Sequence, residues 1–163
     1  MKIGIISDTH NYLCEITKKH LKECDEIWHA GDIGSIELFD ELEKITKVRA
    51  VYGNIDSNEL RITIPEHQRF TIEGFSVWMT HIGGYPGKYD RRIINEIKIN
   101  PPDIFISGHS HILKIIPDNK LNLLHINPGA VGRSGLHKVR TIVIMELKNK
   151  KINDMKVVEL SRR

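Results

Sequence analysis

The chain has 163 residues, of which 40% are hydrophobic and 28% are charged, and its formal net charge is +3. This size and mixed charge predict one globular domain over residues 1–163 and argue against disorder. No apolar run approaches 18 residues and no signal-type leader is present, so we expect a cytoplasmic protein without a membrane span. The dispersed positive charge does not favour nucleic acid as a partner, but it leaves nucleic acid and a homo-oligomer open.

The first third of the chain alternates between strands and helices. We expect strands at residues 2–7, 26–30 and 48–52, one helix over 11–24, and a second helix that Ser35 caps and that presents Leu38, Leu42 and Ile45 on one face. The first helix is expected to bury Leu13, Ile16 and His20. This alternation predicts a parallel sheet with right-handed crossovers.

Two cysteines, Cys14 and Cys24, fall within the first predicted helix. A separation of ten helical residues corresponds to about 15 Å of rise, which is too far for a disulfide. We therefore expect both thiols to be free and partly buried.

The rest of the chain is expected to be mainly β-structure. Residues 69–72 and 75–80 flank Glu73-Gly74, which is a short hairpin signal. A loop at 83–87 precedes a helix containing Ile93, Ile94 and Ile97, which Pro101-Pro102 ends. Further strands are expected at 104–107, 113–116, 121–126, 141–147 and 152–160. Two packed sheets with helices outside would account for this order, with Trp28, Trp78 and Phe105 in the core.

Side chains that bind metals follow the apolar runs at five places. These are Asp8-Thr9-His10, Gly31-Asp32, Gly53-Asn54, His81 and Gly108-His109-Ser110-His111. Because ligands collect beyond the carboxyl ends of strands in open α/β sheets, we expect these side chains to meet. Carboxylate, amide and imidazole groups without a thiolate suit Mn²⁺, Fe²⁺, Zn²⁺, Ni²⁺ or Co²⁺. Seven ligands are more than one ion needs. If Asp32 is shared by two ions, each ion has four ligands.

This series resembles the calcineurin-like metallophosphoesterase superfamily, most closely its small single-domain bacterial and archaeal phosphodiesterases. The resemblance covers about residues 1–135 and implies an α/β fold, a four-layer αββα sandwich of two mixed sheets flanked by helices. It also implies two divalent ions, with Mn²⁺ expected first and Ni²⁺, Fe²⁺, Zn²⁺ or Co²⁺ as alternatives. The first ion would be held by Asp8, His10, Asp32 and His111, and the second by Asp32, Asn54, His81 and His109.

By the same resemblance, the expected activity is that of a phosphoric diester hydrolase acting on a small phosphodiester. A metal-bound hydroxide would attack phosphorus in line, and Asn54 would also touch the phosphate. Two cations suit this chemistry because the transition state spreads negative charge over the phosphoryl oxygens.

One position departs from the pattern of the superfamily. Many members carry a histidine after the asparagine, where it can protonate the leaving oxygen, whereas this chain has Ile55. An aliphatic side chain cannot supply the roughly 10²- to 10⁴-fold effect of a general acid, so we expect a preference for acidic leaving alcohols.

Two further residues are candidates for the site. Asp56 matches an acidic position of the pattern and is a candidate catalytic residue that orients another group, although a turn-stabilising role is the alternative. Arg133 follows Asn127-Pro128-Gly129 and is a candidate phosphate ligand because guanidinium fits phosphate, although Pro-Gly is first a turn signal.

Other interpretations remain open from the sequence. A non-catalytic interaction scaffold is the main alternative, because the small subunit of the retromer coat uses a similar fold in that way. Among enzymes, a phosphomonoesterase fits the same two ions, and a nuclease is less favoured because the chain lacks a basic cluster. The five remaining histidines are not expected to bind metal. His20 is expected on a helix face and His67 and His137 in loops, while His29 and His125 are expected in strands, where they pack in the core or support the site residues.

Overall fold

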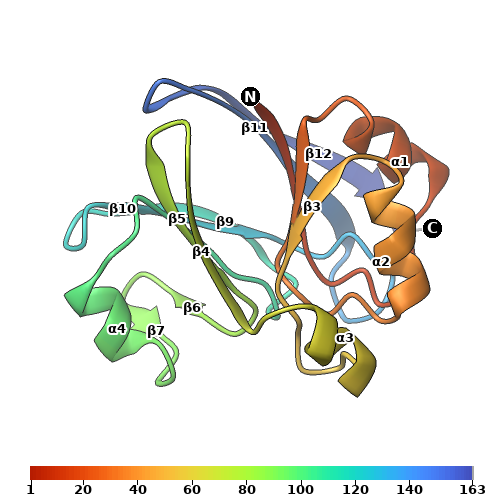
Figure 1. The fold of residues 1–163 in the computed structure, drawn as a ribbon, viewed down its shortest axis with the longest axis horizontal. Helices are drawn as coiled ribbons and strands as arrows, with labels where there is room; N and C mark the ends of the chain where they lie inside the picture. Colours follow the sequence, from red (N-terminus) through yellow and green to blue (C-terminus); the bar gives the residue numbers. More distant parts are fainter. Residues whose placement is uncertain (163) are drawn as a thin grey trace.

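The computed structural model describes residues 1–162 and contains two mixed five-stranded sheets that pack face to face (Figure 1). The first sheet has the order β12-β11-β1-β2-β3. Its strands are β1 (Lys2–Ile6), β2 (Glu26–His29), β3 (Lys47–Ala50), β11 (Val139–Lys148) and β12 (Lys151–Ser161). The strands β1, β2 and β3 are parallel, as predicted, and β11 joins β1 in antiparallel orientation.

The second sheet has the order β4-β5-β8-β10-β9. Its strands are β4 (His67–Ile72), β5 (Phe75–Thr80), β8 (Ile104–Ile106), β9 (Leu113–Asp118) and β10 (Leu123–Pro128). The central strands β5, β8 and β10 are parallel, and both edges are antiparallel. The hairpin predicted at Glu73-Gly74 is confirmed, with both turn residues at positive φ.

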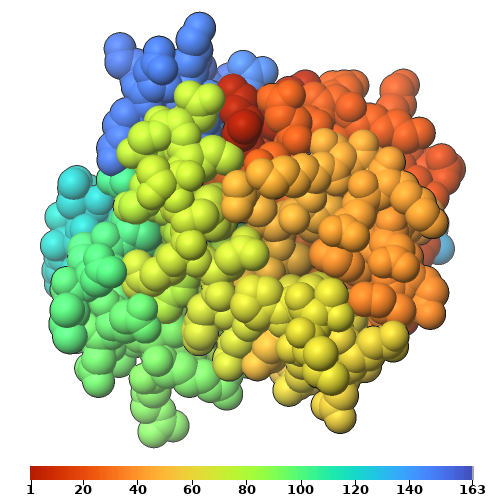
Figure 2. Space-filling model, viewed as in Figure 1, coloured from red at the N-terminus to blue at the C-terminus, as the bar shows by residue number. Residues whose placement is uncertain are grey.

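Four helices are present among residues 1–162: α1 (Glu15–Leu21), α2 (Ile36–Glu43), α3 (Asn58–Thr63) and α4 (Ile94–Ile99). Figure 1 shows α1 and α2 outside the first sheet and α4 outside the second. This arrangement confirms the four-layer αββα sandwich. Figure 2 is a space-filling view from the same side, in which side chains close the gaps between the ribbons of Figure 1. The β11–β12 turn projects at the upper left.

The core has three parts that correspond to the layers. Residues of both sheets, including Ile5, Trp28, Met79 and Ile104, form the central cluster. The second cluster lies beneath α1 and α2, and the third packs α4 against Trp78 and Phe105. The three aromatic side chains predicted for the core are therefore buried, each at 0 or 1% exposure.

The helix predicted over residues 11–24 is shorter than expected. It begins at Glu15 and ends at Leu21, and it buries Thr17 and Leu21, whereas Ile16 is 57% exposed. The predicted buried face was therefore wrong for Ile16, whereas Leu13 is partly buried against the second cluster. The cause lies before the helix, where His10 and Asn11 have positive φ values of 46° and 61° that are incompatible with a right-handed helix.

Both cysteines are free, although they flank α1 rather than lying within it. Cys14 is the N-cap residue and Cys24 follows the helix, where its side chain is buried.

Two short elements were not predicted. Ser57 caps α3 by accepting a hydrogen bond from the backbone of Leu60, which is the only buried residue of that helix. The expected loop at 83–87 instead overlaps a small hairpin of β6 (Gly84–Tyr85) and β7 (Lys88–Tyr89). The helices of residues 1–162 are all too short or too polar to cross a membrane.

Candidate metal centre

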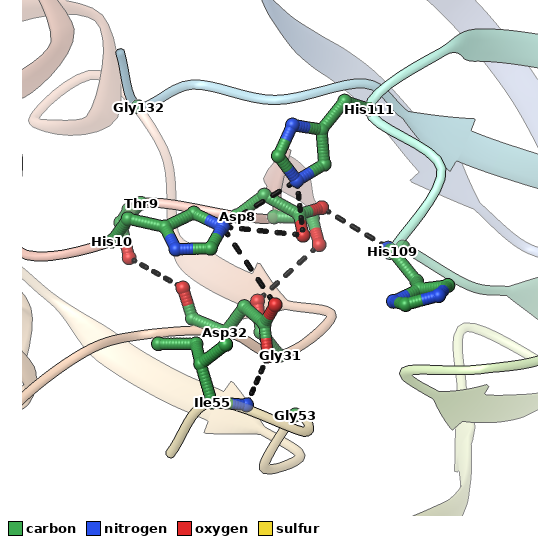
Figure 3. A network of polar contacts seen from close by, with 12 residues as sticks. Asp8, Thr9, His10, Gly31, Asp32, Gly53, Ile55, His109, His111 and Gly132 are labelled. Carbon is green, nitrogen blue, oxygen red and sulfur yellow. Dashed lines mark hydrogen bonds and ion pairs between the residues drawn. The ribbon is translucent and has the colours of Figure 1, made fainter. Parts of the chain in front are cut away.

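The predicted ligands lie on loops that leave the carboxyl ends of strands from both sheets. Asp8 follows β1, Asp32 follows β2, and Asn54 follows β3. His81 directly follows β5 and the His109–His111 segment follows β8. Figure 3 shows Asp8, His10, Asp32 and His111 pointing toward one another, with His10 and His109 on opposite sides of the two carboxylates.

The backbone of these loops is unusual in the same way at several ligand positions. Asp8, His10, Asp32, His109 and His111 all have positive φ values, between 46° and 67°. Such conformations are uncommon for residues other than glycine, and they persist where the surrounding structure holds them. Here the amide of Asp8 donates to Gly31 O at 2.9 Å, and the amide of His10 donates to Asp32 O at 3.1 Å.

The first group of candidate ligands consists of Asp8, His10 and His111, whose donor atoms lie within 4.8 Å of one another. His111 Nε2 lies 3.4 Å from His10 Nε2 and 3.2 Å from Asp8 Oδ1. Asp8 Oδ1 is buried and has no hydrogen-bond partner among residues 1–162, whereas Oδ2 accepts from the amide of His109 at 3.2 Å. A buried carboxylate oxygen without a hydrogen bond is costly unless a cation faces it.

The second group consists of Asp32, His81 and His109, again within 4.8 Å of one another. His81 Nε2 lies 3.2 Å from Asp32 Oδ1 and 3.1 Å from Asn54 Oδ1. His81 Nδ1 lies 2.7 Å from Ala30 O, so a proton on Nδ1 leaves Nε2 free to bind a metal.

Asp32 lies between the two groups. Oδ2 of Asp32 is 3.7 Å from His10 Nε2, while Oδ1 is 3.2 Å from His81 Nε2. Each oxygen therefore faces a different group, which is the placement that a bridging carboxylate requires. All seven predicted ligands are thus brought to one site.

The electrostatics of the site favour bound cations. The only ion pairs of Asp8 and Asp32 among the described residues are with histidines. The adjacent carboxylate of Asp8, with Oδ1 3.2 Å from His111 Nε2, raises the pKa of His111. Burial opposes protonation of His81, but the carboxylates of Asp32 and Asp8 outweigh it and raise its pKa. Two His/Asp groups with converging donors fit a dinuclear divalent-metal site.

Two glycines allow the loops to approach this closely. A Cβ atom on Gly53 would overlap Asp32 Oδ1, and one on Gly108 would overlap Ser7 Oγ and lie 3.1 Å from Asp8 Oδ2. These glycines are needed because the backbone touches the carboxylates directly.

Asp56, Ile55 and Arg133, the other positions that the sequence singled out, lie in different surroundings. Asp56 is buried, and its carboxylate accepts from the amides of Gly34 and Gly53, each at 2.8 Å. The amide of Ile55 donates to Asp32 Oδ1 at 3.1 Å, while its side chain is 46% exposed. Arg133 is exposed and stacks its guanidinium 4.3 Å from the ring of Tyr12.

Two further residues support the site: His29, which was expected to pack in the core or to support the site residues, and Arg61, which was not singled out from the sequence. His29 is buried, and its Nε2 lies 3.0 Å from Thr9 Oγ1 while Nδ1 accepts from the amide of Gly31. Burial lowers the pKa of His29 to about 4, so the ring is neutral near pH 7. Arg61 on α3 donates to the carbonyls of Gly53, Asn54 and Asp56. His29 has no sequence signal beyond its position in a strand, and Arg61 lies on the helix that was not predicted.

Comparison with known proteins agrees with this site. The Calcineurin-like phosphoesterase superfamily domain matches residues 1–150. A probable metallophosphoesterase of Methanothermobacter thermautotrophicus is 33% identical over 138 residues, which are 80% of this chain and 77% of the relative. A phosphodiesterase of Methanocaldococcus jannaschii is 28% identical over 147 residues, which are 79% of this chain and 83% of that protein.

Solved structures show the same fold. A novel archaeal phosphodiesterase aligns with a TM-score of 0.75 and 25% identity over 98% of this chain and all of that one. Vps29 of Entamoeba histolytica complexed with Zn²⁺ aligns with a TM-score of 0.76 and 18% identity over the full length of both chains. The matched domain and the relatives identify the same family, and the two His/Asp groups are consistent with it. The chain belongs to the calcineurin-like phosphoesterase superfamily.

Proposed function

We propose that this chain is a phosphodiesterase that uses two divalent metal ions, with Mn²⁺ as the first candidate. The observation that carries the proposal is the convergence of both His/Asp groups on two buried carboxylates, one of which has an unpartnered oxygen at Asp8 Oδ1. The 28% identical phosphodiesterase relative supports a diester as the substrate. The proposed unit is the single domain of residues 1–163, acting on a small phosphodiester.

The residues have distinct roles in this proposal. Asp8, His10 and His111 would hold one ion, His81, His109 and Asn54 would hold the other, and Asp32 would serve both. Two bound ions would lower the pKa of a coordinated water and polarise the phosphoryl oxygens. The carboxamide of Asn54 lies beside His81 and can donate to a phosphate oxygen. Arg133, whose guanidinium stacks on Tyr12, is the proposed further phosphate ligand.

The side chain of Ile55 supplies no proton donor for a leaving oxygen. Its amide is bound to Asp32, and its side chain is aliphatic. We therefore propose that the enzyme favours diesters with acidic leaving alcohols. Equal rates for aryl and alkyl leaving groups, under conditions in which the chemical step limits turnover, would contradict this part of the proposal.

The test is a panel of metals and substrates. The protein is stripped with chelator, loaded with Mn²⁺, Ni²⁺, Zn²⁺ or Mg²⁺, and assayed against aryl phosphodiesters, aryl phosphomonoesters and nucleic acid. We expect diester hydrolysis that Asp32→Asn abolishes. Asp154→Asn on β12 is the matched control, because Asp154 is exposed and remote from the ligands.

The panel also distinguishes the alternatives. Faster monoester than diester hydrolysis would make the chain a phosphomonoesterase. Absence of hydrolysis with every metal would support a non-catalytic interaction scaffold. Full activity of Asp32→Asn would refute the bridging role of Asp32.

A further inference from the structure

A second cleft opens beside the metal centre, between the β6–β7 hairpin and the outer side of the second sheet. It has a volume of about 390 Å³, and its lining includes Tyr85, Lys88, Tyr89, Arg91, Lys114 and the candidate ligand His109. A neighbouring cleft of about 340 Å³ is lined by Asn54 and His81, and Ile82 lines both clefts. A molecule that reached the metal centre could therefore extend into this cleft past His109.

The cleft has an excess of positive charge. Among residues 1–162 no carboxylate lies within 4.0 Å of the charged groups of Lys88, Arg91 or Lys114. The single acidic residue of the lining is Asp90, whose Oδ1 accepts from the amide of Arg92 at 2.9 Å and lies 3.8 Å from Arg92 Nε. Three cations without ion-pair partners make the cleft suited to an anion.

Lys114 is the best placed of the three cations. It lies on β9 and is half-buried, unlike Lys88 and Arg91, which are exposed. Its Nζ is 3.3 Å from the centroid of the Tyr85 ring. This cation–π contact holds the ammonium group in the cleft at a low cost in side-chain entropy.

The wall opposite Lys114 is held in place by hydrogen bonds. The hydroxyl of Tyr89 donates to Asp118 at 2.7 Å, and the hydroxyl of Ser107 donates to Gly84 O at 3.2 Å. The β6–β7 hairpin is thereby attached to β9 and to the loop after β8. A cleft with fixed walls binds ligand without a large ordering cost.

We infer that this cleft binds a second anionic group of the substrate, a phosphate or a carboxylate carried by one of the two alcohol portions of the phosphodiester. The inference rests on the proposed phosphodiesterase function and adds a substrate class to it. The scissile phosphate occupies the metal centre, and the alcohol portion extends past His109 so that its anionic group pairs with Lys114, with Lys88 and Arg91 at the cleft opening.

The test uses three matched substrates, the 4-nitrophenyl phosphodiesters of phenol, 3-carboxyphenol and 3-phosphonophenol. All release 4-nitrophenol and differ only in the added anion. For the Mn²⁺-loaded protein we expect kcat/KM to be about tenfold higher for at least one anionic substrate than for the phenol ester, a typical effect of a charge-assisted hydrogen bond. Lys114→Met should bring this ratio near one. The better anion identifies whether the group is phosphate-like or a carboxylate.

Lys148→Met is the control with the same loss of charge. Lys148 ends β11, and Figures 1 and 2 place the β11–β12 turn at the opposite end of the view from β6 and β7. This variant should keep the wild-type ratio. Equal kcat/KM values for the three esters, unchanged by Lys114→Met, would overturn the inference while leaving the diesterase function intact.

A binding measurement separates the inference from catalysis. Titration calorimetry of the metal-free protein should detect phenyl phosphate more strongly than phenol, and Lys114→Met should weaken phenyl phosphate binding while Lys148→Met does not. If no diester is hydrolysed but this pattern is observed, the proposed function fails and the anion site stands. Identical binding of phenyl phosphate by both variants would refute the anion site.

Discussion

His10 Nε2 lies 3.4 Å from His111 Nε2, although the two residues are 101 positions apart in the chain. When both rings are neutral and one Nε2 donates to the other, the accepting nitrogen presents a lone pair, and both nitrogens lie beside Asp8. The buried Asp8 Oδ1 adds an acceptor 3.2 Å from His111 Nε2. A cation satisfies these acceptors together, which gives the site measurable consequences.

Metal binding should stabilise the fold. An ion that binds only the native state adds about 2.7 kcal/mol at a concentration of 100 Kd, which corresponds to a rise in Tm of about 5–10 °C for a domain of this size. We expect this rise when Mn²⁺ replaces EDTA in differential scanning calorimetry. His10→Ala combined with His81→Ala should remove it. Equal Tm values for the wild type with Mn²⁺ and with EDTA would count against both metal sites.

The affinity for metal should fall as the solution becomes acidic. Asp8 raises the pKa of His111, and the carboxylates raise that of His81 despite its burial. A raised pKa means that protons compete with the metal up to a higher pH than for an ordinary histidine, whose pKa is about 6.5. Titration calorimetry with Mn²⁺ should therefore show weakening affinity from about pH 7 downward. A constant affinity between pH 8 and pH 5 would contradict this.

Much of the site could be predicted from the sequence because the carboxyl ends of parallel strands lie at the same edge of a sheet. Gly31-Asp32 and Gly53-Asn54 each end an apolar run, and the structure brings both beside His81. The pattern of strand ends therefore predicted the five loops whose side chains meet at this site. It could not show that the carboxylate oxygens of Asp32 face two different groups, since that depends on side-chain rotamers.

The elements that were missed have weak local signals. Only Leu60 of α3 is buried and Ile62 is 88% exposed, so this helix lacks an apolar face that periodicity could reveal. The β6–β7 hairpin has two residues in each strand, too few for a pattern of alternation. The hairpin is held by a contact with a distant residue, the hydrogen bond from Tyr89 to Asp118, and α3 is held by hydrogen bonds from Arg61 to the loop that precedes it.

Gly53→Ala should damage the metal centre more than the fold. The added Cβ would overlap both Asp32 Oδ1 and the amide of Asp32, so the carboxylate must move away from His81. Overpacking of this kind costs about 1–3 kcal/mol of stability. We expect weaker Mn²⁺ binding in calorimetry. Gly87→Ala is the control, because its Cβ meets nothing within 4 Å and only the positive φ of 84° is strained.

Asp56→Asn should reveal whether Asp56 positions the loop or takes part in chemistry. Its two oxygens accept hydrogen bonds from the backbone N–H groups of Gly34 and Gly53. The side chain of asparagine would place its NH₂ group against one of these N–H groups. If the role is positioning, Mn²⁺ affinity falls about tenfold while the pH profile of kcat keeps its shape. If the role is catalytic, kcat falls at saturating metal and the pH profile changes. Asp154→Asn is the matched control for both measurements.

Glu26→Gln should destabilise the fold at neutral pH. Glu26 is buried at 3% exposure, and burial acts to raise its pKa, but hydrogen bonds from Arg49, Lys47 and Trp28 outweigh burial and lower it. We expect a loss of about 1–3 kcal/mol in the free energy of unfolding at pH 7, measured by urea denaturation. A carboxyl whose pKa is lowered by folding stabilises the native state at pH values above its pKa in the unfolded chain, which is about 4.3. The difference in the free energy of unfolding between the variant and the wild type should therefore shrink as the pH falls below about 4. Glu23→Gln, which removes an exposed pair with Lys2, should change stability little at either pH, and an equal loss for both variants would contradict the importance of burial.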